Sequence, residues 1–394
     1  MRVHCIALIF SFLIGIFIVS CGDSDKTVLV SKKDPLNNSS SQLMSHELRK
    51  GSQVLDPIDG PPPHKRFLVA FKGYLSSSEQ RLYIASSRAE LGAAQAVGGS
   101  QLQFLEMAPM NETNYLLVLT EENKKKSIGR LNVQTNFLYN FLSDMGDVFD
   151  LQLSNASQFG FLKREPDGSQ ALNVFFVDSK ETRKKNFSPN ESITYQFAPH
   201  SDFLIYTKTE NNRSSIFKMK LEKESFGESE LILEKEGVRF SHVVINNDEN
   251  KIYFVEKSES LSKLKILDLA SQEEVSIFET ENIYEPALSP NDQYLTFWSE
   301  SSEGQKLLLY EFLSKNLEVI TVLSVPSKTH NPSYYHNRTH PVWTPDSREI
   351  IFSSFNRWYG QIRKYDLVTK TIHVLTDNTF VDFHAPIILG EENP

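Results

Sequence analysis

Apolar and polar positions alternate in short runs along most of the chain, which is the pattern of half-buried β-strands. Three segments show it best, and each contains a short apolar run, a Pro-containing turn and a second run rich in β-formers: Tyr195–Tyr206, Pro286–Phe297 and Pro341–Phe352. Alternation on both sides of a tight turn predicts a β-hairpin. Weaker copies of the same frame occur at residues 105–118, 151–161 and 244–254.

Two further strands follow each hairpin. After the hairpin that ends at Phe352 come the alternating segments Gln361–Leu367 and Thr371–Leu375, separated by a polar turn. The unit is therefore four antiparallel strands, and one apolar anchor recurs in it every 43 to 55 residues, at Val118, Phe161, Tyr206, Phe254, Phe297 and Phe352. Four-stranded units with a period near 45 residues predict an all-β fold, a β-propeller.

The two ends of this repetitive region predict how the ring closes. Residues 383–389 have the pattern of a lone innermost strand, and Phe67–Phe71 with Leu82–Ala85 have the pattern of a blade that lacks one. Joining them removes an open sheet edge, which a propeller cannot leave exposed. Six anchors and this shared blade favour seven blades, with six as the alternative.

The hairpins resemble the WD40-like repeat of the TolB-type β-propeller family, whose usual form is Pro-x-aromatic-Ser-Pro-Asp-Gly followed by an apolar strand. Trp343–Ser347 and Leu288–Asp292 are near matches, with Ser347 and Asp292 in place of the turn glycine. The resemblance covers about residues 100–390. It implies the propeller fold and a docking role in the cell envelope.

The N-terminus has a different pattern. Arg2 precedes an apolar run of about 15 residues, which is typical of a signal peptide and short for a membrane span. The run ends in Ile18-Val19-Ser20-Cys21-Gly22, which resembles a bacterial lipobox and implies acylation of Cys21. We therefore predict a signal peptide at 1–20, a lipidated cysteine with a polar tether at 21–64, and the propeller at 65–394, anchored by lipid in the bacterial cell envelope.

Composition and missing motifs narrow the function. The 394 residues include 41 basic and 50 acidic side chains, a net charge of −9 that argues against a nucleic-acid partner. Cys5 and Cys21 are the two cysteines, so the predicted mature body contains no thiol for catalysis or metal binding. The sequence has no Gly-x-Ser-x-Gly, His-Glu-x-x-His or phosphate-loop motif, and no catalytic residue is assigned.

Candidate chemistry lies at one point of each innermost strand. Counting three residues back from the Trp343 position in every repeat gives Phe104, Asp150, Thr194, His242, Glu285 and His340, with His384 or Ala385 on the closing strand. His242, His340, His384, Glu285 and Asp150 together predict a divalent metal site at the channel, such as some lyases resembling this family possess. The alternative is that these side chains hydrogen-bond to neighbouring blades and no cofactor binds.

A second cluster lies in the insertion at residues 324–339. His330, Tyr334, Tyr335 and His336 there are candidates for a partner-binding loop, because long loops on rigid scaffolds often carry binding; the alternative is a solvated loop. Two classes of function remain. One is a lipid-anchored docking scaffold for another envelope protein; the other is a metal-dependent, carbohydrate-acting lyase or a ligand-binding propeller that uses the channel histidines.

Overall fold

The computed structural model describes residues 65–74, 80–88, 94–97, 102–110, 112, 114–155, 157–222, 226–302, 304–323, 340–356, 359–376 and 382–392. The chain divides into two units, Met1–Pro63 and His64–Pro394, and all described residues belong to the second. Cys21 and the predicted partner loop with His330, Tyr334, Tyr335 and His336 lie outside the described residues. Within the described ranges, no helix combines the length and apolar character needed to cross a bilayer.

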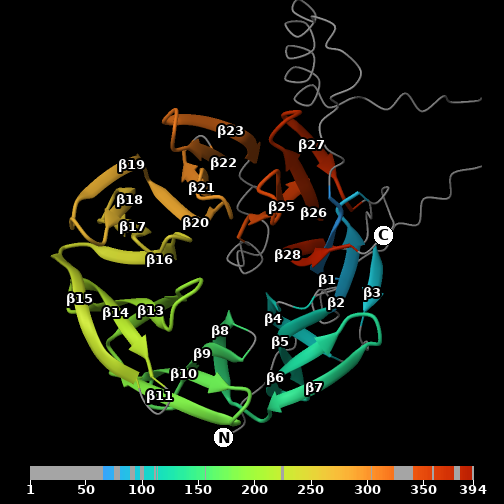
Figure 1. The fold of residues 1–394 in the computed structure, drawn as a ribbon, viewed down its shortest axis with the longest axis horizontal. Coiled ribbons are helices and arrows are strands. Elements are labelled where there is room, and N and C mark those ends of the chain that lie inside the picture. The colour runs from blue at the N-terminus through green and yellow to red at the C-terminus, as the bar shows by residue number, and fades with distance from the viewer. Residues whose placement is uncertain are drawn as a thin grey trace, which may run out of the picture. The chain divides into compact units, whose positions relative to one another are not determined.

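Seven four-stranded antiparallel sheets surround a central axis (Figure 1). Blade 1 has the order β28 (Asp382–Glu391), β1 (Phe67–Tyr74), β2 (Gln80–Ser86), β3 (Gln95–Val97). Blade 2 is β4 (Gln103–Pro109), β5 (Tyr115–Glu122), β6 (Lys125–Asn132), β7 (Phe137–Leu142), and blade 3 is β8 (Asp147–Asn155), β9 (Gln158–Arg164), β10 (Gln170–Phe176), β11 (Glu181–Phe187).

The remaining four blades repeat the same order from the axis outward. Blade 4 is β12 (Ser192–Phe197), β13 (Phe203–Glu210), β14 (Arg213–Leu221), β15 (Phe226–Glu236), and blade 5 is β16 (Arg239–Ile245), β17 (Lys251–Lys257), β18 (Ser262–Asp268), β19 (Glu274–Thr280). Blade 6 is β20 (Asn282–Leu288), β21 (Tyr294–Ser301), β22 (Gly304–Glu311), β23 (Asn316–Leu323), and blade 7 is β24 (Val342–Trp343), β25 (Glu349–Asn356), β26 (Tyr359–Asp366), β27 (Thr371–Val374).

The predicted closure is confirmed, and it settles the ring at seven blades. β28 pairs with β1 and supplies the innermost strand of blade 1, so the two ends of the propeller share one sheet. At the start of β1, the Lys65 ammonium lies 2.9 Å from the Glu391 carboxylate. Six blades would leave the strands of blade 1 without a place in the ring.

Apolar side chains fill the spaces between blades. The described core consists of seven clusters, and each joins the facing sheets of two neighbouring blades. All six predicted anchors lie on second strands and are at most 3% exposed. Burial of one large apolar side chain contributes about 1.5–3 kcal/mol, so these contacts between blades are the main source of stability.

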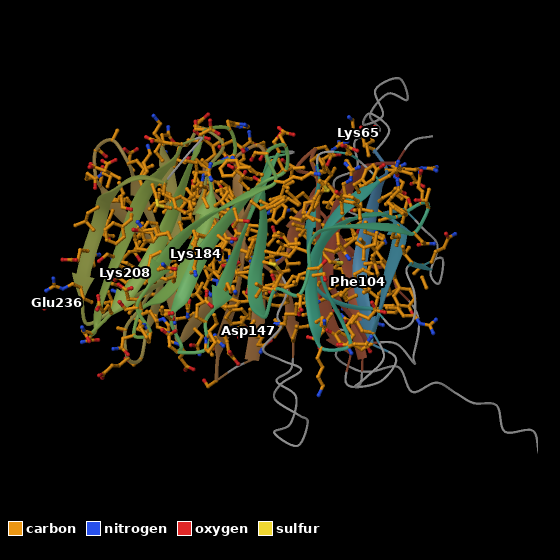
Figure 2. All side chains as sticks on the ribbon, turned by 90° about the horizontal axis from the view of Figure 1, so that it is seen from below. Lys65, Phe104, Asp147, Lys184, Lys208 and Glu236 are labelled. Atoms are coloured by element: carbon orange, nitrogen blue, oxygen red, sulfur yellow. The ribbon has the colours of Figure 1, made fainter. Side chains whose placement is uncertain are left out.

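Two rims bound the ring. The innermost strand of each blade begins at one rim, as β8 does at Asp147, and ends at the other. The second strand of each blade begins at that other rim, as β1 does just after Lys65. Figure 2 shows Lys65 and Asp147 on opposite sides of the disc. We call these the Lys65 rim and the Asp147 rim.

Candidate functional site

A β-bulge places several of the predicted residues at one level of the channel wall. In β8, β16, β20 and β28 the pairing with the second strand shifts by one residue at the middle of the strand. The first residue of each bulge has positive φ: Asp150 (56°), His242 (52°), Glu285 (53°) and Ala385 (54°). A bulge re-aims side chains locally, so these positions are equivalent around the axis.

One position differs from the expected frame, and on the closing strand the structure selects one of the two predicted residues. In β4 the extra residue comes at Leu105, and Met107 pairs with the Val118 anchor. Glu106 therefore takes the axial level in blade 2, while Phe104, predicted there by residue counting, is fully buried in the core. On the closing strand Ala385 occupies the bulge; the backbone of His384 pairs opposite Lys72, and its side chain lies outside the described residues.

Glu285 and His340 form an ion pair in the channel wall. The His340 Nε2 atom lies 2.7 Å from Glu285 Oε2; the His340 side chain is 63% exposed and the Glu285 side chain 17%. Burial alone would lower the pKa of His340, but the charge and hydrogen bond of Glu285, with the charge of Asp150, raise it above 6.5. Glu285 thus favours the protonated form of His340.

Burial and neighbouring charges also shift the pKa values of the other axial groups. Burial raises the pKa of Asp150 to about 6; a hydrogen bond from Gln152 opposes the shift, and the charge of Glu106 adds to it. Burial lowers the pKa of His242, and the negative charge of Glu285 partly offsets that effect. Asp150, His242, Glu285 and His340 therefore lie near enough for the charge of one group to shift the pKa of another.

Among the described side chains, no three His, Cys, Asp or Glu residues converge in a way that could hold a metal ion. His340 and Glu285 are bonded to each other. Two of the five predicted ligands thus come together, while the His384 side chain is outside the described residues. The metal site stays a prediction.

Polar side chains near the axis link blades 1 to 4 through backbone groups. Lys72 Nζ donates to a carbonyl oxygen of β4 at 2.9 Å, and burial lowers the Lys72 pKa to about 8. The Glu106 carboxylate accepts two consecutive N–H groups of the β8 bulge, at 2.9 and 2.6 Å. Gln152 Nε2 donates to the Tyr195 carbonyl at 2.8 Å, and the Tyr195 hydroxyl donates to the Asp150 carbonyl at 2.6 Å.

A second set of links joins blades 4 to 7 at the hairpin turns of the Lys65 rim. Its members, the latch residues, are Glu249, Asp292 and Ser347, with φ of 56°, 56° and 58°. Glu249 accepts two backbone N–H groups of the blade 4 turn at 2.7 and 2.8 Å, and Asp292 accepts the Asn247 N–H of blade 5 at 3.0 Å. Ser347 Oγ accepts the Asn291 N–H of blade 6 at 3.1 Å. The side chains that replace the turn glycine thus hold the preceding blade.

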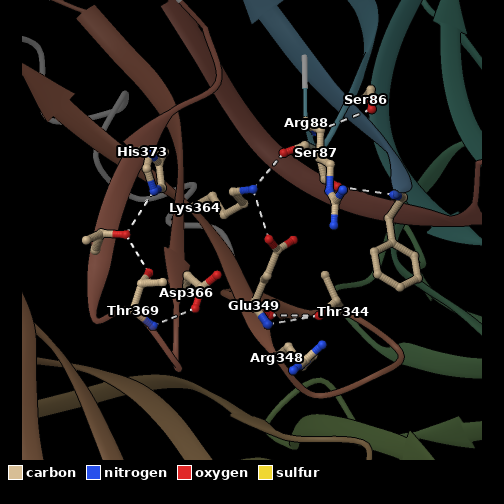
Figure 3. A network of polar contacts seen from close by, with 12 residues as sticks. Ser86, Ser87, Arg88, Thr344, Arg348, Glu349, Lys364, Asp366, Thr369 and His373 are labelled. Atoms are coloured by element: carbon tan, nitrogen blue, oxygen red, sulfur yellow. Dashed lines mark hydrogen bonds and ion pairs between the residues drawn. The ribbon is translucent and has the colours of Figure 1, made fainter. Parts of the chain in front are cut away.

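A buried ion pair completes the ring between blades 7 and 1 (Figure 3). Lys364 Nζ donates to the Ser87 carbonyl and to Glu349 Oε1, both at 2.9 Å. The two charged side chains are only 11% and 5% exposed. Burial raises the pKa of Glu349, and the hydrogen bond and charge of Lys364 oppose this shift. The sequence pattern did not single out this pair, because both residues occupy ordinary positions of alternating strands.

Comparisons with known proteins support the fold. No protein-family model and no curated protein sequence matches the chain. Solved structures do: TolB from Acinetobacter baumannii has a TM-score of 0.52 at 11% identity, covering 82% of this chain and 67% of that one. An oligogalacturonate lyase in complex with manganese has a TM-score of 0.56 at 11% identity, covering 80% and 86%.

A prolyl endopeptidase structure has a TM-score of 0.58 at 9% identity; it matches over 82% of this chain, which spans only half of that protein's length. Proteins with such different names share this architecture, and at these identities the likeness extends to the fold alone. The class defined by the strand order and these matches is a seven-bladed β-propeller similar to TolB.

Proposed function

We propose that the protein is a lipid-anchored component of the bacterial cell envelope whose propeller is a docking scaffold for another envelope protein. The observation that carries the proposal is that polar side chains near the axis bond to neighbouring blades. Lys72, Glu106, Gln152 and Tyr195 are bonded to backbone groups of neighbouring blades. Side chains bonded in this way stabilise a rigid ring, and a rigid ring presents loops at fixed positions on both rims.

The anchor rests on the sequence around Cys21. Two or three acyl chains on that cysteine would hold the protein at a membrane almost permanently, because each buried methylene contributes about 0.8 kcal/mol. The polar segment from Gly22 to about His64 would separate the propeller from the lipid.

Lipidation is tested by metabolic labelling with an alkyne fatty acid. The wild-type chain is expected to incorporate the label and to partition into detergent, and Cys21→Ser to lose both properties. Cys5→Ser is the matched control, because Cys5 would leave with the signal peptide, and it should label normally. Equal labelling of the Cys21→Ser chain would refute the anchor.

Docking is tested by photo-crosslinking in intact envelopes. A photoreactive residue is placed at exposed turn positions of the Asp147 rim, such as Lys124, and of the Lys65 rim, such as Asn291. Thr182, exposed on the outer strand of blade 3, is the control position. Discrete light-dependent adducts at one rim, absent at Thr182, support docking; a full set of rim positions without adducts would contradict it.

The alternative of a metal-dependent enzyme is favoured by one observation, the Glu285–His340 pair in a channel that solvent reaches. Metal analysis of the purified chain separates the two functions. Stoichiometric metal lost in both His242→Ala and His340→Ala, and kept in His373→Ala on the outer strand β27, would replace the docking proposal with an enzyme. No bound metal in the folded wild type would exclude the channel metal site.

A further inference from the structure

Exposed apolar side chains concentrate on two neighbouring blades. Six of the ten large hydrophobic residues that are exposed in the described structure belong to blades 6 and 7: Leu313, Leu317, Val319, Val322, Val368 and Ile372. Leu313 is 94% exposed and Val368 is 58% exposed. Surface apolar residues scattered singly need no explanation, whereas a group on adjacent elements marks an interaction site.

The turn between the third and fourth strands provides an internal comparison. It has the same form in blades 2, 3, 5, 6 and 7: the second turn residue is exposed and the fourth has a φ of 53° to 60°. In blades 2, 3 and 5 the second residue is small or polar (Gln134, Asp178, Ala270), and in blades 6 and 7 it is Leu313 and Val368. The fourth residue is Lys315 in blade 6 and Lys370 in blade 7. Only these two of the five described turns combine an exposed large apolar side chain with a lysine two residues later.

These two turns, which we call the apolar tips (Leu313–Lys315 and Val368–Lys370), lie on the Lys65 rim. Third strands run antiparallel to second strands and therefore end at the rim where second strands begin, and β1 begins after Lys65. Blade 7 is the neighbour of blade 1, and blade 6 is next to it (Figure 1). The apolar tips thus lie on the rim at which residue 65 enters the propeller.

The chemistry of the tips matches a lipid surface. An exposed aliphatic side chain gains most by entering the boundary between headgroups and acyl chains, and a lysine beside it reaches headgroup phosphates. Lys315 is exposed. Lys370 Nζ lies 2.7 Å from the Glu318 carboxylate, and both side chains are part-exposed. The negative charge of Glu318 therefore offsets much of the positive charge of Lys370. The apolar side chains therefore provide the main attraction, and the lysines add to it on anionic bilayers.

We propose that the apolar tips contact the phospholipid bilayer directly and hold the propeller with its Lys65 rim towards the membrane. The inference deepens the proposed membrane attachment but does not require the lipid on Cys21. It leaves the Asp147 rim facing away from the membrane, free for a protein partner.

An environment-sensitive fluorophore at single introduced cysteines tests the contact. The full chain with Leu313→Cys or Val368→Cys is labelled with a nitrobenzoxadiazole maleimide and reconstituted into vesicles of phosphatidylcholine and phosphatidylglycerol. Emission is expected to rise roughly twofold or more, because the label moves about 5–10 Å into the boundary region, and nitroxide-labelled lipid should quench it. Lys124→Cys, on an exposed turn of the Asp147 rim, is the control and should report water. Emission at Leu313→Cys and Val368→Cys no higher than at Lys124→Cys would overturn the proposal.

A flotation assay separates this contact from lipidation. If the otherwise unsubstituted Cys5→Ser chain takes the maleimide label, Cys21 is free and the anchor has failed, but the tips are still testable. With the full chain carrying Cys5→Ser and Cys21→Ser, adding Leu313→Ser and Val368→Ser should weaken vesicle binding about tenfold, since two apolar groups lose their burial. Adding Gln134→Ser and Ala270→Ser should leave binding unchanged. A lipid-independent dimer that the two tip substitutions abolish would assign the tips to self-association and overturn the bilayer contact.

Discussion

Replacing the latch residue Glu249 by glycine should destabilise the propeller, although glycine is the usual residue of this turn in the family it resembles. Glu249 has a φ of 56°, which costs an ordinary residue about 1 kcal/mol. Its carboxylate accepts the backbone N–H groups of His200 and Ser201, at 2.7 and 2.8 Å, and the Ser201 hydroxyl. Glycine would relieve the strain and remove the link between blades 5 and 4.

The magnitude follows from these contacts. Three hydrogen bonds at a part-exposed site contribute about 1 kcal/mol each. Relief of the positive φ is worth about 1 kcal/mol, but glycine returns most of it through the greater entropy of the unfolded chain. The net loss for Glu249→Gly is therefore about 2.5–3 kcal/mol. Glu249→Gln keeps an acceptor oxygen and should lose about half as much.

Guanidinium unfolding at pH 7, followed by the fluorescence of buried Trp298 and Trp343, measures the difference. Gln272→Gly is the control, because Gln272 has a φ of 60° and its side chain bonds only within its own turn; its stability should change by less than about 0.5 kcal/mol. Hydrogen bonds from Ser201 and His200 outweigh burial and lower the pKa of Glu249. Its contribution is therefore present above the unfolded pKa and lost as pH falls through the folded one. A glycine variant as stable as the wild type would refute the latch.

Three further outcomes are expected. Lys364→Met leaves the Glu349 carboxylate buried without its partner and should cost about 3 kcal/mol in denaturant unfolding, whereas Lys370→Met, at an exposed pair, should cost under about 1. Because the pKa of Asp150 is raised from 3.8 to about 6, ionisation disfavours the fold, and stability should fall as pH rises through that window; Asp150→Asn should flatten this part of the pH–stability curve, and an unchanged slope would contradict the assignment. Gly160→Ala should lower the melting temperature, because a Cβ at this position would lie 2.7 Å from a carbon of the Phe197 side chain in blade 4. The expected loss of stability is about 1–3 kcal/mol. An unchanged melting temperature would contradict this clash.

The blade repeat and its closure could be predicted because both follow from the alternation of apolar and polar residues within short segments. Three of the six anchors, such as Phe297, follow a Pro-containing turn, and all six lie in apolar strands that can be recognised without information from distant residues. The bulges are different, because one extra residue shifts the frame without changing the apolar pattern. That is why counting residues selects Phe104 where the structure places Glu106.

The hydrogen bonds between blades also could not be predicted from the sequence pattern. Asp292 reads as a departure from the turn glycine, and nothing in its own repeat shows that its carboxylate accepts a backbone N–H from a turn 45 residues earlier. Lys364 likewise reads as a polar strand residue until the ring brings the Ser87 carbonyl beside it. A partner in the next blade is visible only when the curvature of the ring is known.

The pairing of β28 with β1 has a consequence for biogenesis. β1 emerges early in synthesis, yet the strand that covers its inner edge is made last, and the contact of Lys65 with Glu391 spans 326 residues. Such a distant contact forms slowly, because the cost of closing the loop is met only when the final strand arrives. A chain cut before residue 382 would therefore be an arrested ring with an uncovered strand edge, open to proteolysis and strand exchange, rather than a smaller propeller.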